Sequence, residues 1–248
     1  MIIIKSKHEI DIMREAAKVT GEILRNLEDY IKPGMSTLDV DHYIEDTIRS
    51  YKMTPTFKGY CGFPGSACIS INEEIVHGIP SDKRIIKEGD IVTVDTGSTY
   101  NGFASDAART YGIGEISEDA RNLIDVTKKS FFAGIEYARQ GFRLSDISHA
   151  IQECAESAGY SVVREYVGHG IGRNMHEDPQ IPNYGKPGCG PVLKEGMVLA
   201  IEPMICQGTH KVKTLKNGWT AVTKDGKLSA HYENTVVIND GEPELLTL

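Results

Sequence analysis

The chain has 248 residues, 40% of them hydrophobic, and a formal net charge of −8 at pH 7. This length and apolar content allow a full core, built either as one large domain or as two closely packed halves. The negative charge argues against a large nucleic-acid-binding surface. The apolar run at the N-terminus is too short for a signal peptide, and no later run approaches the length of a membrane span. We therefore expect a cytoplasmic protein without membrane contact.

The cysteines give no sign of a structural framework. Their number is odd and no two have C-x-x-C spacing, which predicts free thiols instead of disulfides or a zinc ribbon. They are Cys61, Cys68, Cys154, Cys189 and Cys206.

The first part of the chain predicts two helices followed by strands. Apolar residues recur at helical spacing from residue 8 to about 31, and Pro33-Gly34 ends the pattern. Ser36 or Thr37 can cap a second helix, which continues to about residue 51. Extended segments follow at residues 67–71 and 75–77.

A β-branched run, Ile91–Val94, leads into Asp95-Thr96-Gly97. It predicts a buried strand that delivers a carboxylate at its end. Asn101-Gly102 is a typical hairpin turn, which would return the chain antiparallel to Asp106. Because Asp95 and Asp106 lie at roughly symmetric distances from this turn, we expect both carboxylates to face the same side.

The same sequence plan occurs twice. Lys87–Asp95 aligns without gaps on Lys194–Glu202, 107 residues later, and an acid closes both copies. No Ser/Pro-rich linker separates them. This repeat predicts one domain, 1–248, made of two halves of about 1–115 and 116–248.

The second half repeats the order of elements found in the first. Helices are predicted from residue 120 to about 140 and from 144 to 158, with a strand at 160–167. A Gly-rich segment around His169, a strand at 197–202 and a strand pair at 219–223 and 231–238 follow. Two helices and then strands, repeated, predict an α+β fold whose helices cover one face of an antiparallel sheet.

Five residues with metal-ligand chemistry stand at predicted strand ends or in Gly-rich turns. Four carboxylates crowded together repel one another, and burying each charge costs roughly several kcal/mol. Two divalent cations would remove this conflict, and oxygen ligands with one imidazole suit Mn, Fe, Co or Zn better than Ca. The five residues are Asp95, Asp106, His169, Glu202 and Glu233.

These residues, with Gly168–Gly172, Glu202-Pro203-Met204 and Tyr232–Thr235 around them, resemble the type I methionine aminopeptidases. The resemblance extends over nearly the whole chain and is to the short bacterial form. Prolidases and X-Pro aminopeptidases share the five-residue set. Three further features indicate the methionine branch: Gly59–Pro64, His77–Pro80 and Trp219.

The resemblance implies a single catalytic domain with the pita-bread (creatinase/aminopeptidase-like) fold of two pseudo-symmetric halves. It also implies co-translational removal of the initiator methionine, with a preference for a small second residue. The substrates would be nascent polypeptide N-termini that begin with methionine, and the ribosome would be a further partner. Two divalent ions, Co, Mn, Fe or Zn, would activate a hydroxide nucleophile. No long apolar seam suggests an obligate oligomer, so we expect a monomer.

The family's residue roles are carried over where the motifs match. Asp95 would bind one ion, His169 and Glu202 the other, and Asp106 and Glu233 both. Glu202 would also shuttle the proton to the leaving amine. Two histidines, His77 and His176, would contact the substrate amide and the tetrahedral oxyanion. The methionine box would be lined by Phe57, Tyr60, Phe63, Cys68, Met175 and Trp219, with His77 at its rim.

Other interpretations fit parts of the sequence. Asp95–Ser98 matches the loop of aspartic proteases, but these enzymes need two such acids and the chain has one Asp-Thr-Gly. A binding module that lost catalysis should lack some ligands or auxiliary histidines, and all seven residues are present. The prolidase or X-Pro branch remains the enzymatic alternative, although its members usually carry an additional N-terminal domain. We expect the remaining histidines to be surface or helix residues: His8, His42, His149, His210 and His231.

Overall fold

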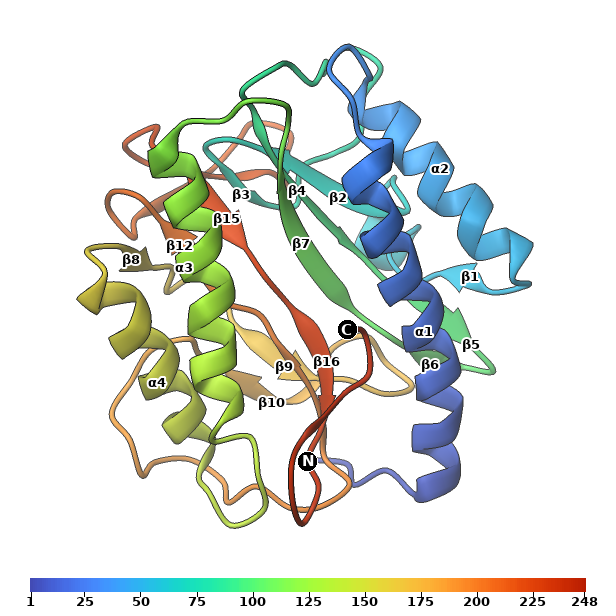
Figure 1. Cartoon of the computed structure of the whole chain (residues 1–248). Coiled ribbons are helices and arrows are strands. Elements are labelled where there is room, and N and C mark those ends of the chain that lie inside the picture. Colours follow the sequence, from blue (N-terminus) through green and yellow to red (C-terminus); the bar gives the residue numbers. More distant parts are fainter.

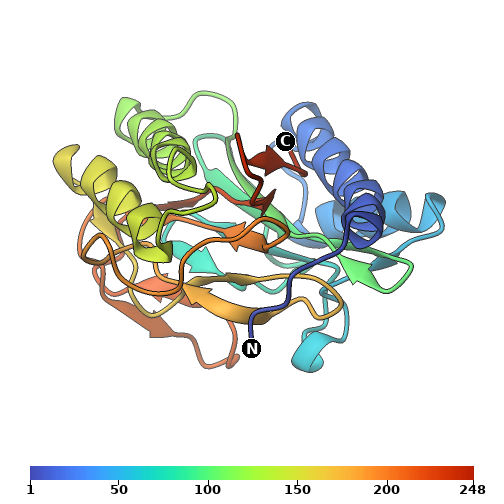
Figure 2. The same cartoon turned by 90° about the horizontal axis from the view of Figure 1, so that it is seen from below.

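The computed structural model describes all 248 residues and arranges them in two layers. Four helices lie on one side of a curved layer of antiparallel strands, as the view from below shows (Figure 2). The helices are α1 (Lys7–Tyr30), α2 (Thr37–Ser50), α3 (Glu118–Ile135) and α4 (Leu144–Ser157). In Figure 1, α1 and α2 lie on the right and α3 and α4 on the left. The predicted α+β class, with helices on one face, is confirmed.

Each helix of the first half begins at a serine that forms a capping box. The Ser6 hydroxyl accepts a hydrogen bond from the Glu9 N–H, and the Glu9 carboxylate accepts one from the Ser6 N–H. Ser36 and Asp39 repeat this pair of bonds before α2. A cap of this kind contributes about 1 kcal/mol to helix stability.

Helix α3 differs from its predicted range of 120–140 at both ends. Ser117 caps it by accepting a bond from the backbone three residues later, so the helix begins at once after this serine. At the other end, Tyr137 and Ala138 donate their N–H groups to carbonyls three residues back. This tighter turn ends the α-helix at Ile135.

Two sets of antiparallel strands carry the predicted acids, one in each half. The strands are β1 (Thr54–Pro55), β2 (Ala67–Ile71), β3 (Glu74–Val76), β4 (Ile91–Thr96), β5 (Ser98–Tyr100), β6 (Phe103–Ala104), β7 (Ala107–Gly112), β8 (Ser161–Val162), β9 (Gly168–Gly170), β10 (Glu177–Ile181), β11 (Val198–Ile201), β12 (Met204–Cys206), β13 (Val212–Thr214), β14 (Ala221–Thr223), β15 (Ser229–His231), β16 (Asn234–Val237) and β17 (Glu244–Leu245). In the first half, β4 lies between β2 and β7; in the second, β11 lies between β9 and β16.

The predicted hairpin is present and turns at Asn101-Gly102. Both residues have positive φ, 46° and 78°, as the tight hairpin turn requires. In the β4–β7 ladder, Asp95 lies opposite Ala108. Asp106 precedes Ala108 by two residues, so Asp95 and Asp106 are diagonal neighbours on one face.

Two predicted strands are shorter than expected. The prediction of a strand at 160–167 is wrong beyond Val162, because the partner strand β12 has only three residues. The pairing ends where the Val163 N–H donates to the Met204 carbonyl. The strand at 231–238 is broken before β16, because β15 pairs with β12 whereas β16 pairs with β11. Glu233 lies at this change of partner.

Strand β7 of the first half runs beside β15 and β16 of the second (Figure 1), and polar groups join them. The Thr110 hydroxyl lies 3.0 Å from the backbone nitrogen of His231 and 2.9 Å from the backbone carbonyl oxygen of the same residue. The Thr235 hydroxyl contacts the same two backbone groups of Asp106, at 3.0 and 2.8 Å. Glu233 donates its N–H to the β7 backbone at 3.0 Å. These bonds fix the relative position of the two halves beside the acids.

The backbone repeats the sequence offset of 107 residues. Ser36 and Ile85 form an isolated antiparallel bridge, and Arg143 and Val192 form another at the corresponding positions. The hydrogen bonds that flank the two bridges recur as well. This recurrence supports two repeated halves within one domain, and that division stays a prediction.

The apolar core also separates into two main clusters. One, of 17 buried residues, joins α1 and α2 to β2 and β4. The other, of 14 buried residues, joins α3 and α4 to β11 and β16. Both acid-bearing strand sets are therefore anchored from the helical side. None of the four helices combines the length and the apolar character that crossing a membrane requires.

Candidate active site

Two of the predicted ligands come from the first half. Asp95 lies near the end of β4 and Asp106 directly precedes β7, and both side chains are buried. Each of the two carboxyl groups lies close enough to shift the pKa of the other. The hairpin therefore delivers a pair of acids to one place.

The second half adds the other three predicted ligands. Glu202 follows β11 and Glu233 precedes β16, and the register of these strands puts the two residues opposite each other. His169 lies on β9, the other neighbour of β11. Its Nε2 is 3.5 Å from Glu202 Oε1 and 3.8 Å from Asp106 Oδ2. The structure thus brings all five residues together.

Burial sets the protonation of this cluster. Burial raises the pKa of Asp95 to about 7, although the neighbouring Asp106 carboxyl lowers it. The pKa values of Asp106, Glu202 and Glu233 are raised well above their usual range, first by burial and then by the neighbouring acids. Burial lowers the pKa of His169 to about 3, so its imidazole is neutral near pH 7. Neutral imidazole is the form that binds metals.

The donor atoms fit a divalent cation. Asp95 Oδ1, Asp106 Oδ1 and Glu233 Oε1 are buried without a hydrogen-bond partner, which is rare for buried polar atoms. One donor atom from each of Asp106, His169 and Glu233 lies within 4.8 Å of the other two. Carboxylate oxygens with imidazole nitrogen suit borderline metals such as Mn, Fe, Co and Zn. The cluster is therefore a candidate metal centre.

A cavity of about 350 Å³ opens beside the cluster, and the acids, His169 and every residue predicted for the methionine box line it. Phe63 and Trp219 meet edge-on, with 5.1 Å between ring centroids. The buried Cys68 has a pKa raised well above its ordinary value by burial, so it remains a thiol. The cavity thus joins an apolar box to the acids. Some lining residues were not predicted, because no sequence pattern distinguishes them: Cys61, Val76, Tyr166, Val167 and Met204.

His77 and His176 line the same cavity. His77 has a φ of 61°, in the left-handed region that often marks functional sites in non-glycine residues. His176 Nδ1 lies 2.8 Å from the Tyr60 hydroxyl, which leaves Nε2 free for a ligand. Burial lowers the pKa of His77 to about 4 and also lowers that of His176. Both rings are therefore neutral near pH 7.

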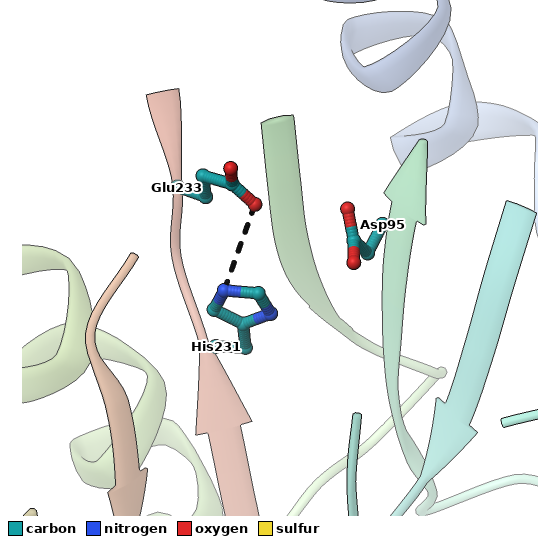
Figure 3. A group of neighbouring side chains, drawn as sticks. All are labelled: Asp95, His231 and Glu233. Atoms are coloured by element: carbon teal, nitrogen blue, oxygen red, sulfur yellow. Dashed lines mark ion pairs between the residues drawn. The ribbon is translucent and has the colours of Figure 1, made fainter. Parts of the chain in front are cut away.

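The prediction for His231 is wrong, since this residue lies on β15 and is only 1% exposed. Its Nε2 is 3.7 Å from Glu233 Oε2 and 3.8 Å from Glu202 Oε2. Figure 3 shows His231, Glu233 and Asp95 turned toward one another. Burial lowers the pKa of His231 to about 3, so these contacts join a neutral ring to the acids and are not ion pairs.

One signal in the sequence pointed to His231. The residue precedes Glu233 by two positions in a predicted strand, and side chains two apart share a face. The four other histidines with the same expectation are exposed or half-buried.

Comparison with known proteins first gives the class, a metallopeptidase: residues 11–240 match metallopeptidase family M24. A methionine aminopeptidase of Clostridium acetobutylicum is 62% identical over 248 residues, which cover 100% of this chain and 99% of that protein. The crystal structure of a methionine aminopeptidase from Thermotoga maritima gives a TM-score of 0.98 at 47% identity, covering 100% of this chain and 99% of that one.

A prolidase from Pyrococcus furiosus gives a TM-score of 0.81 at 26% identity, and the match covers 99% of this chain and 65% of the prolidase. The chain belongs to metallopeptidase family M24 and, within it, to the methionine aminopeptidases. The family and the pita-bread fold indicated by the sequence are confirmed.

Proposed function

We propose that the chain removes the N-terminal methionine from proteins by metal-dependent hydrolysis of the first peptide bond. The observation that carries this proposal is the shared cavity, in which an apolar box lies beside a buried acid–imidazole cluster. A methionine side chain in the box would place the peptide bond that follows it near the acids. Sulfur and aromatic walls favour a thioether through dispersion and S–aromatic contacts. We also propose a preference for a small second residue.

We assign two divalent ions to the cluster, from among Mn, Fe, Co and Zn. Asp95 would hold one ion, His169 and Glu202 the other, and Asp106 and Glu233 would contact both. Two overlapping groups of donor atoms, which share Glu233, support this number. When bound, the ions supply Lewis-acid stabilisation and lower the pKa of the attacking water.

The other roles belong to side chains of the chain itself. Glu202 would take the proton of the water and give it to the leaving amine, as a carboxyl group within hydrogen-bond reach of both can do. The neutral rings of His77 and His176 would donate hydrogen bonds to the substrate amide and the developing oxyanion. One such donor contributes roughly 3–4 kcal/mol to transition-state stabilisation.

We propose nascent polypeptides that begin with methionine as the natural substrates, processed co-translationally by a monomer that contacts the ribosome. Such chains are made in the cytoplasm, where we expect the enzyme to act.

The test follows the release of free amino acids from short peptides. Chelator-stripped protein is titrated with Mn, Fe, Co or Zn and mixed with Met-Ala-Ser, Met-Phe-Ser or Ala-Pro-Ser. We expect metal-dependent release of methionine, fast from the first peptide and slow from the second. Free alanine from the third would move the enzyme to the prolidase side. No cleavage with any metal would favour a binding module that has kept the fold without catalysis.

A further inference from the structure

His231 completes a second acid–imidazole group in the site. One donor atom from each of Asp95, His231 and Glu233 lies within 4.8 Å of the other two, and all three residues are buried (Figure 3). The group of Asp106, His169 and Glu233 meets the same criterion. Each group has one aspartate and one histidine, and Glu233 belongs to both. Ligands about 2.0–2.2 Å from one ion lie at most about 4.4 Å apart, so both groups are nearly as compact as a loaded site.

The ring of His231 lacks a partner within the protein. Both its nitrogens are buried and neither makes a hydrogen bond. The distances of 3.7 Å to Glu233 and 3.8 Å to Glu202 are too long for hydrogen bonds. Because buried polar atoms are normally paired, an unpaired ring turned toward carboxylates points to a ligand that the chain does not supply.

The backbone that carries this ring is held in a fixed place. His231 pairs with Met204 in the β12–β15 ladder on one side. On the other side, the Thr110 hydroxyl bonds to both its N–H and its carbonyl. A buried side chain on such a backbone, 1% exposed here, loses little conformational entropy on binding a metal.

We propose that His231 is a metal ligand, binding through Nε2 the ion that Asp95 holds, so that each of the two ions has one imidazole. The proposal rests on the dinuclear function proposed above. It adds a nitrogen to a position that the family resemblance gave to carboxylates alone. A nitrogen ligand there favours Mn, Fe, Co or Zn over Mg and Ca, which prefer all-oxygen sites.

The first test measures metal binding by the full-length protein without any peptide. Apoprotein is titrated with Co²⁺ in a calorimeter, and the visible absorption of bound Co²⁺ is recorded. The variants are His231→Gln and His231→Leu, with His42→Gln as the matched control because His42 is exposed on α2. We expect one of two binding steps to weaken at least about 10-fold in both His231 variants, with a changed Co²⁺ spectrum. The control should match the wild type.

A folded His231→Gln protein with both wild-type affinities and the wild-type spectrum would overturn the proposal, and leave His231 a packing residue. Because binding is measured without substrate, this result is independent of the proposed function. A wild-type protein that binds two ions yet releases no methionine would refute the function and leave the ligand assignment in place.

A second test needs no variant at His231 and decides the matter if those variants fail to fold. The ring N–H of a histidine bound to Co²⁺ gives an exchangeable proton signal shifted far outside the normal NMR range. The Co²⁺-saturated wild type should show two such signals, from His169 and His231. A single signal would overturn the proposal.

Discussion

The two halves of the molecule contain the same three-strand arrangement, but the outer strands bring different side chains to the cavity. In the first half the central strand β4 has β2 as one neighbour, and Cys68 on β2 lies opposite Asp95 and forms part of the box wall. In the second half the central strand β11 has β9 as one neighbour, and β9 carries His169 into the acid cluster. One outer strand therefore lines the proposed methionine box, and the other contributes a candidate metal ligand.

The chemistry of the two outer-strand residues explains this difference. Burial raises the pKa of the Cys68 thiol, so it remains protonated and behaves as a small apolar group. Burial lowers the pKa of His169, so its imidazole remains neutral and able to bind a metal. A repeated backbone thus carries two proposed roles because single side chains differ.

The largest expected effect comes from the acid at the end of the second central strand. Glu202→Ala should lower turnover of Met-Ala-Ser by roughly 10³-fold or more, because it removes a proposed proton carrier and a proposed ligand together. Circular dichroism and the thermal midpoint should stay close to wild type. Glu242→Ala, at an exposed position, is the control. An active, metal-replete Glu202→Ala enzyme would remove this residue from the mechanism.

The contrast between the outer strands can be tested directly with one substitution in each. His169→Ala should weaken metal binding more than about 100-fold, beyond the usual effect of changing a residue that only supports a ligand. Cys68→Ala should leave metal binding unchanged and raise the KM for Met-Ala-Ser, since it alters only the box. Calorimetry and steady-state kinetics separate the two effects. Equal metal affinities for the two variants would contradict the contrast.

The next effect concerns His77, which the first half supplies. His77→Ala should lower kcat by about 10²-fold with a smaller change in KM, because an oxyanion donor acts mainly in the transition state. His77→Asn is the matched control that keeps the backbone conformation, since asparagine tolerates the left-handed φ of this position. Undiminished kcat in the alanine variant would exclude the role.

A smaller contrast concerns how each half holds its outer strand. Asp41 of α2 accepts hydrogen bonds from the N–H groups of Ser66 and Ala67, at 2.7 and 2.9 Å, where β2 begins. Ser148, 107 residues later, is buried and its hydroxyl has no partner. Asp41→Ala should lower the free energy of unfolding by about 1–3 kcal/mol, because two buried N–H groups lose their acceptor. Ser148→Ala should change it by less than about 0.5 kcal/mol. Urea denaturation of both variants checks this contrast.

The smallest expected effect is a pH dependence at Asp41. Burial raises its pKa above 3.8 in the folded protein, although its backbone hydrogen bonds lower it. Between pH 3.8 and the raised pKa of the folded protein, the carboxyl loses its proton in the unfolded chain before it does so in the folded one. The contribution of this carboxyl to stability therefore falls as pH rises through that range. Asp41→Asn keeps an acceptor and cannot ionise, so its stability relative to wild type should increase as pH rises above 3.8 and then level off. A difference that is constant with pH would show that the pKa of Asp41 is not raised.

The sequence alone determined the elements whose signals are local. Apolar spacing predicts α1, a serine or threonine cap predicts the start of α2, and the Asn-Gly turn predicts the Asp95–Asp106 hairpin. These signals are local because neighbouring residues supply the bonds that stabilise each element. The repeat also predicted that Asp95 and Glu202 occupy corresponding strand ends. The motifs that resemble the family named the residues of the box and the five candidate ligands.

Only the tertiary structure decided where strands change partners and which side chains become buried. The strand at 160–167 ends early because β12 is short, and Tyr166 then lines the cavity. His231 is buried where several segments meet β15, among them β7 of the other half, more than 100 residues away along the chain. Burial of this kind depends on contacts between distant segments, and no local pattern of residues encodes it.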